Sequence, residues 1–573
     1  MSPVLVTALC FAVYIAGYHF YAGHLARRVF RLDPDFKTPA HTMTDSVDYV
    51  PTRKGILFGH HYASIAGLSP MLGPAIAVIW GWVPALLWVV FGTIFIGAVH
   101  DFSTLVLSVR RRGTSIGKVA EDVMGRRAKT LFHVIIFFLI SLAMGVFAYV
   151  VATLFSSPAP PAQPSGVQHP EAVLPTVSLM LLAICVGLLV YKRNARITPL
   201  TAIAFVIMLG LVFVGLANPI LGIGRDSWTY ALLIYCFIAS ILPVWLLLQP
   251  RDYLNSLLLF LGLLLMYLGF FARGPSFAAP AVQADPEGAP SLFPFVFITI
   301  ACGAISGFHG LVSSGTTAKQ LNKEPDAKFI GYGGMIGESM LGLVAVLACT
   351  CGFATMTDWA RHYSSWNAAE GLGPKMAAFI TGAGTFLTSL GIPRAWGEAF
   401  VALIAISFAL TSMDSGTRLL RFNINEVGET LRWPIFKNRY ISSALAAGAI
   451  GFFALLRVPM DVGGATQYRP AGLALWALFG TTNQILGGLA LLAVTLYLWQ
   501  KRRPVVFTLV PMVFMLVTTL AAMIENLGKY IGGEKYALLI IGGLIFLFAL
   551  WLAVEAVIRL VQYARGRVPP ITF

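Results

Sequence analysis

The stretch that decides the fold is GILFGHHYASIAGLSPMLGPAIAVI, residues 55–79. It has the length and apolar character of a membrane-spanning helix, but glycine and proline stand where a lipid-facing helix would carry leucine. These interruptions are Gly59, Gly67, Pro70, Gly73 and Pro74. Unpaired backbone groups cost several kcal/mol each in hydrocarbon, so a break at membrane depth is tolerated only where it is buried in protein or lines a cavity. The stretch therefore predicts a broken helix and, with it, a binding site.

A second apolar stretch, LFPFVFITIACGAISGFHGLVSSG at residues 292–315, shares a G-x-H-x5-G frame with the first. One shift along the chain places Gly59, His61 and Gly67 on Gly307, His309 and Gly315. The two stretches are the second and ninth predicted spans, so they cross the membrane in opposite directions. This pattern predicts an inverted repeat whose two broken helices hold a substrate near the midplane. The alternative is a pair of glycine-rich helices that only pack closely.

The composition is that of an integral membrane protein. The 573 residues are 57% hydrophobic and 11% charged, with a mean hydropathy of +0.78, whereas soluble domains are about 25% charged. No polar block is long enough for a soluble domain. The first span, 3–23, lacks a basic region before it and a cleavage site after it, so we expect a retained anchor, not a signal peptide.

The chain is therefore predicted to be an all-α polytopic membrane protein with about fifteen transmembrane helices, in a range of about 14 to 18. The predicted spans are 3–23, 55–79, 83–108, 131–155, 174–191, 200–218, 228–248, 253–272, 292–315, 333–355, 394–417, 440–457, 471–499, 504–524 and 536–560. We expect an N-terminal helix and loop (1–54), a transport core (55–439) and a C-terminal helical bundle (440–573). Residues 371–394, rich in Gly and Thr, are expected to form an extracellular or re-entrant hairpin.

Basic residues set the orientation. Most of the 40 Lys and Arg fall in alternate loops, which predicts that the N-terminus lies outside the cell membrane and the C-terminus in the cytoplasm. This asymmetry accounts for the net charge of +15 without nucleic acid as a partner. The opposite loops at 156–173 and 274–291 are rich in Pro and Ala, lack Lys and Arg, and are expected to be irregular.

Histidines lie beside both interrupted stretches. His60 and His61 neighbour the first and His309 the second, so they could carry protons, hydrogen-bond a substrate or bind a metal. Three histidines could fill a zinc site, but satisfied structural histidines are as common. The predicted substrate-binding residues are Gly59, His60, His61, Ser64, Gly67, Gly307, His309, Ser313, Ser314 and Gly315.

Ionisable and oxygen-bearing residues within spans are candidates for ion coupling. Asp101 and Glu338 could each carry a proton, or could form interhelical pairs. Near the end of the eleventh span, a dense group of oxygens suits Na+, a proton or a substrate amine, or close helix packing. That group is Thr411, Ser412, Asp414 and Ser415. Asn483 and Gln484 are expected to make interhelical hydrogen bonds.

The sequence motifs of several other activities are absent. The sequence lacks GxxxxGK[ST], H-E-x-x-H and C-x-x-C-H, which argues against an ATP-driven pump, and we expect no enzyme activity. Its six cysteines all lie in apolar stretches, where neutral thiols are expected and not disulfides. No cofactor is required; the expected coupling ion is H+ or Na+.

Five long strings carry a resemblance to a known family. They are DYVPTRKGILFGHHYASIAGLSPMLGPAIA (48–77), WGWVPALLWVVFGTIFIGAVHDF (80–102), SGFHGLVSSGTTAKQL (306–321), LTSMDSGTRLLRF (410–422) and LWALFGTTNQILGG (475–488). Through them the chain resembles the carbon starvation protein A family of bacterial transporters, although it looks shorter than the best-known members.

The resemblance implies a secondary transporter linked to carbon starvation that takes up peptides, or pyruvate with protons. It also implies a leucine-transporter-like inverted repeat in which the first helix of each half is broken and residues 411–415 complete a cation site beside the first break. The expected partners are a small-molecule or peptide substrate and the lipid bilayer. Two other hypotheses stay open from the residues alone: a passive channel, and a sensor or redox protein that binds a metal or haem.

Overall fold

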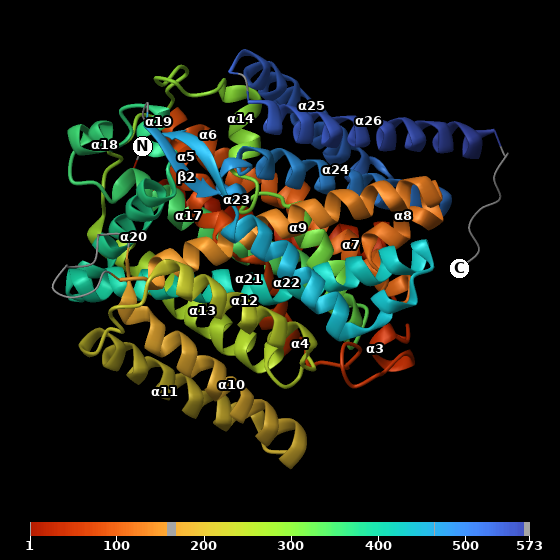
Figure 1. Ribbon diagram of the computed structural model, residues 1–573, viewed down its shortest axis with the longest axis horizontal. Helices are drawn as coiled ribbons and strands as arrows, with labels where there is room; N and C mark the ends of the chain where they lie inside the picture. The colour runs from red at the N-terminus through yellow and green to blue at the C-terminus, as the bar shows by residue number, and fades with distance from the viewer. Residues whose placement is uncertain (1, 158–167, 463–464, 534, 566–573) are drawn as a thin grey trace.

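The computed structural model describes residues 2–157, 168–462, 465–533 and 535–565, and it is almost entirely helical (Figure 1). Within these residues, eleven helices are long and apolar enough to cross a membrane. They are Pro3–Val29 (α1 to η2), Trp82–Arg110 (α6, η4 and α7), Arg126–Phe155 (α9), Pro170–Arg193 (η5 and α10), Ile197–Ala217 (α11), Leu248–Arg273 (α13), Lys328–Cys351 (η7 and α17), Arg394–Leu431 (α21), Ala477–Gln500 (α24), Val506–Gly532 (α25) and Tyr536–Arg559 in α26. The predicted all-α polytopic fold is confirmed.

Four predicted spans are shorter or broken helices. Arg225–Ile241 (α12) and Arg439–Leu455 (α22) have 17 residues each, and the other two spans are interrupted stretches. Among the described residues, eleven helices, or twelve with one bent pair counted as a span, meet this test of length and apolar character, so the predicted count of about fifteen is not confirmed.

The first interrupted stretch is broken as predicted. Lys54–Ile65 (α4) and Ser69–Ala77 (α5), which continues to Trp80, meet at an angle of 47°. Pro70 lies in the first turn of α5. A backbone N–H at this position has no acceptor within the helix, so the helix loses no hydrogen bond when proline stands there. The proline therefore starts the second half-helix and does not bend the first.

The second stretch is broken over a longer segment. Leu292–Thr299 (α14) ends before a non-helical segment at 300–306, and Gly307–Val312 (α15) continues through Ser313–Thr317 (η6) to Ala318–Gln320 (α16). The G-x-H-x5-G frame precedes the first break but follows the second. The frame therefore does not mark equivalent positions of a repeat, and its match is a coincidence of two glycine-rich helices.

Side chains from other helices satisfy the backbone of the second break. On α24, Asn483 accepts from the Phe308 N–H at 3.0 Å, and Gln484 donates to the Ile305 carbonyl at 3.3 Å. From the opposite side, Trp88 Nε1 donates to the Ile300 carbonyl and Thr93 Oγ1 to the Gly303 carbonyl, each at 3.0 Å. The predicted interhelical role of the two amides is confirmed, and it is what permits non-helical backbone at this depth.

Helix packing reveals an inverted repeat of five helices. The first set is α4–α5, Trp82–Arg110, α9, α12 and α13; the second is α14–α15, Lys328–Cys351, α21, α22 and α24. The contacts between helices come in matched pairs. Helix α9 packs on α22, and their counterparts α21 and α12 pack on each other. Helix α4 packs on α13, and their counterparts α15 and α24 also pack on each other. When each of the five elements in a set is counted as one membrane crossing, the corresponding elements of the two sets run in opposite directions. The repeat thus rests on packing and on helix order.

The remaining segments surround this core. Figure 1 shows α10 with α11 along one edge and α25 with α26 along the opposite edge. Residues 371–394 do not form the expected hairpin, because Leu372–Thr388 is a single helix (α20) that packs on α17 and α21. Contacts also continue across the predicted boundary at residue 439, since α22 packs on α9 and α21.

Short elements complete the outer loops. They are Pro39–Thr42 (α3), Ile116–Met124 (α8), Met356–His362 (α18), Trp366–Ala369 (α19), Pro434–Lys437 (η8), Ala471–Ala474 (α23) and an antiparallel hairpin of Arg457–Val462 (β1) and Ala465–Pro470 (β2). Residues 274–291 contain no helix or strand, as expected. Most of the other predicted irregular loop, 158–167, lies outside the described residues.

Replacing Asn483 by Ala tests the support of the second break. The change leaves the buried Phe308 N–H without its acceptor, which costs about 1–3 kcal/mol, so we expect a lower thermal unfolding temperature in detergent. The control is Asn218→Ala, because the Asn218 side chain is exposed and donates only within its own helix, to Val214. Equal melting of the two variants would contradict this role.

Candidate functional site

The half-helices α4 and α15 contact each other and carry the predicted histidines. His60, His61 and His309 are all fully buried, and the Nδ1 atom of each one pairs with a different residue. His60 Nδ1 lies 2.6 Å from Asp252 Oδ2 on α13, and His61 Nδ1 lies 2.9 Å from Thr317 Oγ1. The predicted site is therefore divided into two separate clusters of buried polar groups.

The first cluster surrounds His309 and joins three helices. Its Nδ1 lies 3.1 Å from Asp101 Oδ2 on α7, and its Nε2 lies 3.3 Å from Glu338 Oε2 on α17. Asp101 also accepts from His100 Nδ1, at 2.8 Å. The predicted candidates Asp101 and Glu338 are thus interhelical partners of one predicted histidine, and all four side chains are fully buried. We call these residues the His309 cluster.

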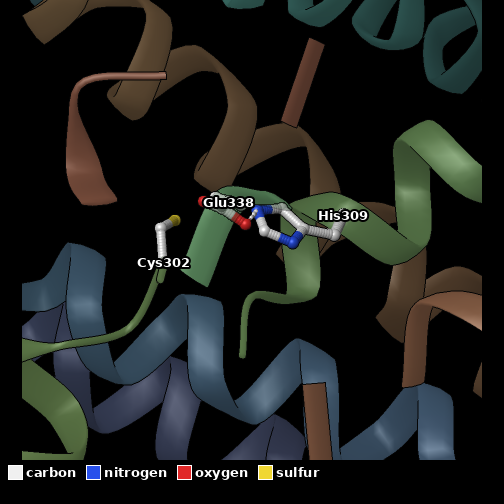
Figure 2. Close-up of side chains that lie close together, drawn as sticks. All are labelled: Cys302, His309 and Glu338. Carbon is white, nitrogen blue, oxygen red and sulfur yellow. Dashed lines mark ion pairs between the residues drawn. The ribbon is translucent and has the colours of Figure 1, made fainter. Parts of the chain in front are cut away.

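Cys302 lies beside this cluster, and no pattern in the sequence singles this cysteine out from the other five. It lies in the non-helical segment of the second break, and Figure 2 shows its side chain together with those of His309 and Glu338. One atom from each of these residues lies within 4.8 Å of the others. Among the described residues, this is the one such group of three potential metal ligands. This group contains His309 but neither of the other two histidines, since His60 pairs with Asp252 and His61 with Thr317.

The second cluster is centred on Arg251, a buried arginine in the first turn of α13. Its guanidinium pairs with Asp414 on α21 and donates to Asp252 at 2.9 Å. Tyr235 on α12 donates to Asp414 at 2.6 Å. Because Asp252 also holds His60, this network connects α4 to three other helices. We call it the Arg251 cluster; it consists of His60, Tyr235, Arg251, Asp252 and Asp414.

The serines near Asp414 lie on another side of α21 and contact the first broken helix. Ser412 Oγ donates to the Ser64 carbonyl at 2.9 Å, and Ser415 Oγ lies 2.7 Å from Ser64 Oγ. Thr411 instead accepts from Asn255 on α13, at 2.9 Å. The expected contact between 411–415 and the first break is present, but Asp414 points to Arg251 and does not join the serines in one group of oxygen ligands.

The predicted glycines are positions of close helix packing. A Cβ on Gly59 would lie 2.6 Å from Ser256 Oγ and 3.2 Å from the Tyr253 backbone, and one on Gly67 would lie 2.8 Å from Ser412 Oγ. Gly307 packs in the same way against the backbone of α24, and Gly315 packs against Leu419. Ser313 and Ser314 are fully buried within η6, and Ser314 donates to the Gly310 carbonyl. These residues bring the half-helices close to their neighbours.

Sequence reasoning missed Arg251 and Asp252 because they stand at the end of a predicted span and were counted with a cytoplasmic loop. The structure begins α13 at Leu248 and buries both. An adjacent Arg-Asp pair directly before an apolar run is the signal that could have found them, since charged residues at a helix end are inexpensive only when they reach water.

A further ionic contact closes the loop that precedes α4. Asp48 lies 2.6 Å from Arg418 and 3.2 Å from Arg421. Burial alone would raise the pKa of Asp48, but the charges of Arg418, Arg421 and Lys319 outweigh it and hold this pKa below its usual range. Asp48 therefore stays ionised and ties the loop to α21.

The structure also contains two cavities near the basic ends of the helices. One of about 350 Å³ lies among the loops and is lined by charged residues that include Arg31, Arg110, Glu324 and Lys501. It is separate from both clusters. The other, about 30 Å³, lies beside Gly315 and Lys319 and has room for about one water molecule. A peptide or keto acid does not fit there.

Comparisons with known proteins agree over most of the chain. The sequence profile of the family described as carbon starvation protein CstA matches residues 2–359 and 351–522. A peptide transporter CstA from Campylobacter jejuni is 32% identical, over 93% of this chain and 81% of that protein. One from Bacillus subtilis is 30% identical over 98% and 97%. The pyruvate/proton symporter BtsT of Escherichia coli is 31% identical over 91% and 81%.

Replacing Gly59 by Ala tests whether α4 must lie directly against α13. The new methyl group meets Ser256 and the Tyr253 backbone, and overpacking of this kind costs about 1–3 kcal/mol, so thermal unfolding in detergent should occur at a lower temperature. Gly55→Ala is the matched control on the same helix, since nothing lies within 4 Å of its Cβ position. A Gly59→Ala protein as stable as the control would show that the contact is not tight.

Proposed function

This chain belongs to the carbon starvation protein CstA family, and on that premise we propose that it is a secondary active transporter. It imports peptides, or a small carboxylate such as pyruvate, across the bacterial inner membrane in response to carbon starvation, and a proton drives the uptake. The observation that carries the proposal is the pair of helix breaks in an inverted repeat, each beside a buried charged cluster. Transporters with such repeats bind their substrates at the interrupted helices.

The first break is the better candidate for holding a substrate carboxylate. At the second, Asn483 already occupies the Phe308 N–H. At the first, α5 begins with Ser69, which keeps 9% of its surface exposed while Ser64 keeps none. The positive end of the α5 dipole favours an anion at this point. We therefore assign the carboxylate to the start of α5, with the amide or keto group of the substrate toward α15.

Coupling to a proton fits the Arg251 cluster. One guanidinium faces two carboxylates, and Asp252 also holds His60 on α4. Movement of α4 away from α13, which opening toward the cytoplasm requires, must break the contact between His60 and Asp252. A proton on Asp414 weakens its hold on Arg251 and so loosens the network. Sodium is less well supported, because the oxygens of 411–415 are divided between Ser64, Asn255 and Arg251.

Orientation follows from the basic loops. We assign the N-terminus to the periplasm and the C-terminus to the cytoplasm, which places Arg110, Lys192 and Lys501 on the cytoplasmic side. Asp48, Arg251 and Asp414 then lie in the cytoplasmic half, where a gate for release belongs. The predicted bilayer and the small-molecule or peptide substrate remain the partners.

Transport into proteoliposomes tests the function. Labelled di- and tripeptides and labelled pyruvate are each offered with and without an inward proton gradient, and we expect one of the two classes to accumulate only with the gradient. Uptake that never exceeds equilibrium would instead identify a passive facilitator. If neither class moves, the proposed substrates are wrong.

Replacing Asp414 by Asn tests the coupling. The amide imitates a protonated carboxyl group, so gradient-driven accumulation should fall by at least about tenfold, a loss of about 1.4 kcal/mol, while exchange of substrate for substrate continues. The control is Asp226→Asn, because Asp226 is exposed and pairs with Arg225 and Arg457 at the surface. Unchanged accumulation in the Asp414 variant would show that proton coupling does not depend on Asp414.

A further inference from the structure

We propose that Cys302, His309 and Glu338 form a binding site for one divalent metal ion of the zinc class. The three residues come from the second break, from α15 and from α17, and all are buried. This inference goes beyond transport and does not depend on the proposed substrate or on its coupling ion.

The ligand types and their spacing suit such an ion. Thiolate sulfur, imidazole nitrogen and carboxylate oxygen are the three donors that zinc takes in proteins. With metal–ligand bonds of about 2.0–2.2 Å, neighbouring N and O ligands of a tetrahedral ion lie about 3.4 Å apart. His309 Nε2 and Glu338 Oε2 are 3.3 Å apart, and the sulfur of Cys302 lies within 4.8 Å of both ligands. Figure 2 shows the three side chains around a common point.

The contact between His309 and Glu338 is not explained by ordinary hydrogen bonding. His309 Nδ1 faces the Asp101 carboxylate, which can only accept, so this nitrogen carries the proton. In neutral imidazole, Nε2 then presents a lone pair to a carboxylate oxygen. Neither Nε2 nor either Glu338 oxygen has a hydrogen-bond partner of normal geometry, although all are buried. Either a second proton on the imidazole or a metal ion must lie between this buried nitrogen and the carboxylate, and the absence of normal hydrogen-bond geometry favours the metal ion.

Surrounding groups support a metal ion at that point. Asp101 orients His309 as the carboxylates behind metal-bound histidines do. Asn483 Nδ2 lies 3.8 Å from the Cys302 sulfur, where its N–H stabilises a thiolate. Among the described residues, no Lys or Arg pairs with Asp101 or Glu338, so no fixed positive charge neutralises the cluster. Three protein ligands leave a fourth position of a tetrahedral ion open.

Cobalt titration of the purified full-length protein in detergent tests the site. Co2+ replaces zinc in sites with these ligands and reports thiolate ligation through a sulfur-to-cobalt charge-transfer band. After removal of bound metal with a chelator, we expect one equivalent of Co2+ to produce this band and Zn2+ to displace it. Cys302→Ala should abolish the band, whereas Cys349→Ala, which changes another buried cysteine outside the group, should retain it.

A second variant keeps the test decisive if Cys302→Ala does not fold. Glu338→Gln preserves shape and the sulfur ligand, so the band should persist while the affinity for Co2+ falls by at least about tenfold. The proposal is overturned if the wild-type protein gives no charge-transfer band, if the band survives in Cys302→Ala, or if the affinity is unchanged in Glu338→Gln. Transport assays are not needed for any of these readings, so failure here leaves the transport proposal standing.

Discussion

The structure depends on the hydrogen bonds that replace a helical ladder at the second break. In hydrocarbon, each free backbone N–H or C=O costs several kcal/mol, so residues 300–306 can leave the helix only where other side chains meet the backbone there. Trp88 and Thr93 approach from one side, and Asn483 and Gln484 from the other. The break is thus held open by a span from each half of the repeat.

Glycines allow this arrangement to be compact. Gly59 lets α4 lie on α13, Gly67 lets the first break touch Ser412, and Gly307 lets α15 lie on α24. Close approach then places polar side chains of different helices within bonding distance, and burial makes each pairing obligatory because water is excluded. The two clusters follow from this closeness: one joins α7, α15 and α17 through His309, and the other joins α4, α12, α13 and α21 through Arg251.

The clusters divide the chemistry of the molecule. The Arg251 cluster contains a permanent cation and ties the half-helix α4 to α12, α13 and α21, which suits the proposed gate that responds to a proton. The His309 cluster has carboxylates, imidazoles and a thiol but no lysine or arginine pair among the described residues, which suits a bound cation. In the proposed mechanism, the His309 cluster stays in place beside the breaks while the contacts of the Arg251 cluster form and break.

The contact of 411–415 with the first break was expected only from the family resemblance, whereas the sequence by itself determined the membrane class, both broken helices and the interhelical role of Asn483 and Gln484. The features that the sequence determined follow from local physics: apolar length, glycine and proline within a span, and amides that must find partners in lipid. It also singled out Asp101, His309 and Glu338 as costly residues, but it could not pair them. The shared G-x-H-x5-G frame led to a wrong match between the two stretches, because the first break lies at the end of its frame and the second break lies before its frame.

Only the tertiary structure decided which helices meet. It brought Cys302 to His309, moved Arg251 and Asp252 from a supposed loop into a buried network, and separated the three histidines that the sequence had grouped. Residues hundreds of positions apart become neighbours only through helix packing, and neither hydropathy nor spacing along the chain encodes that packing.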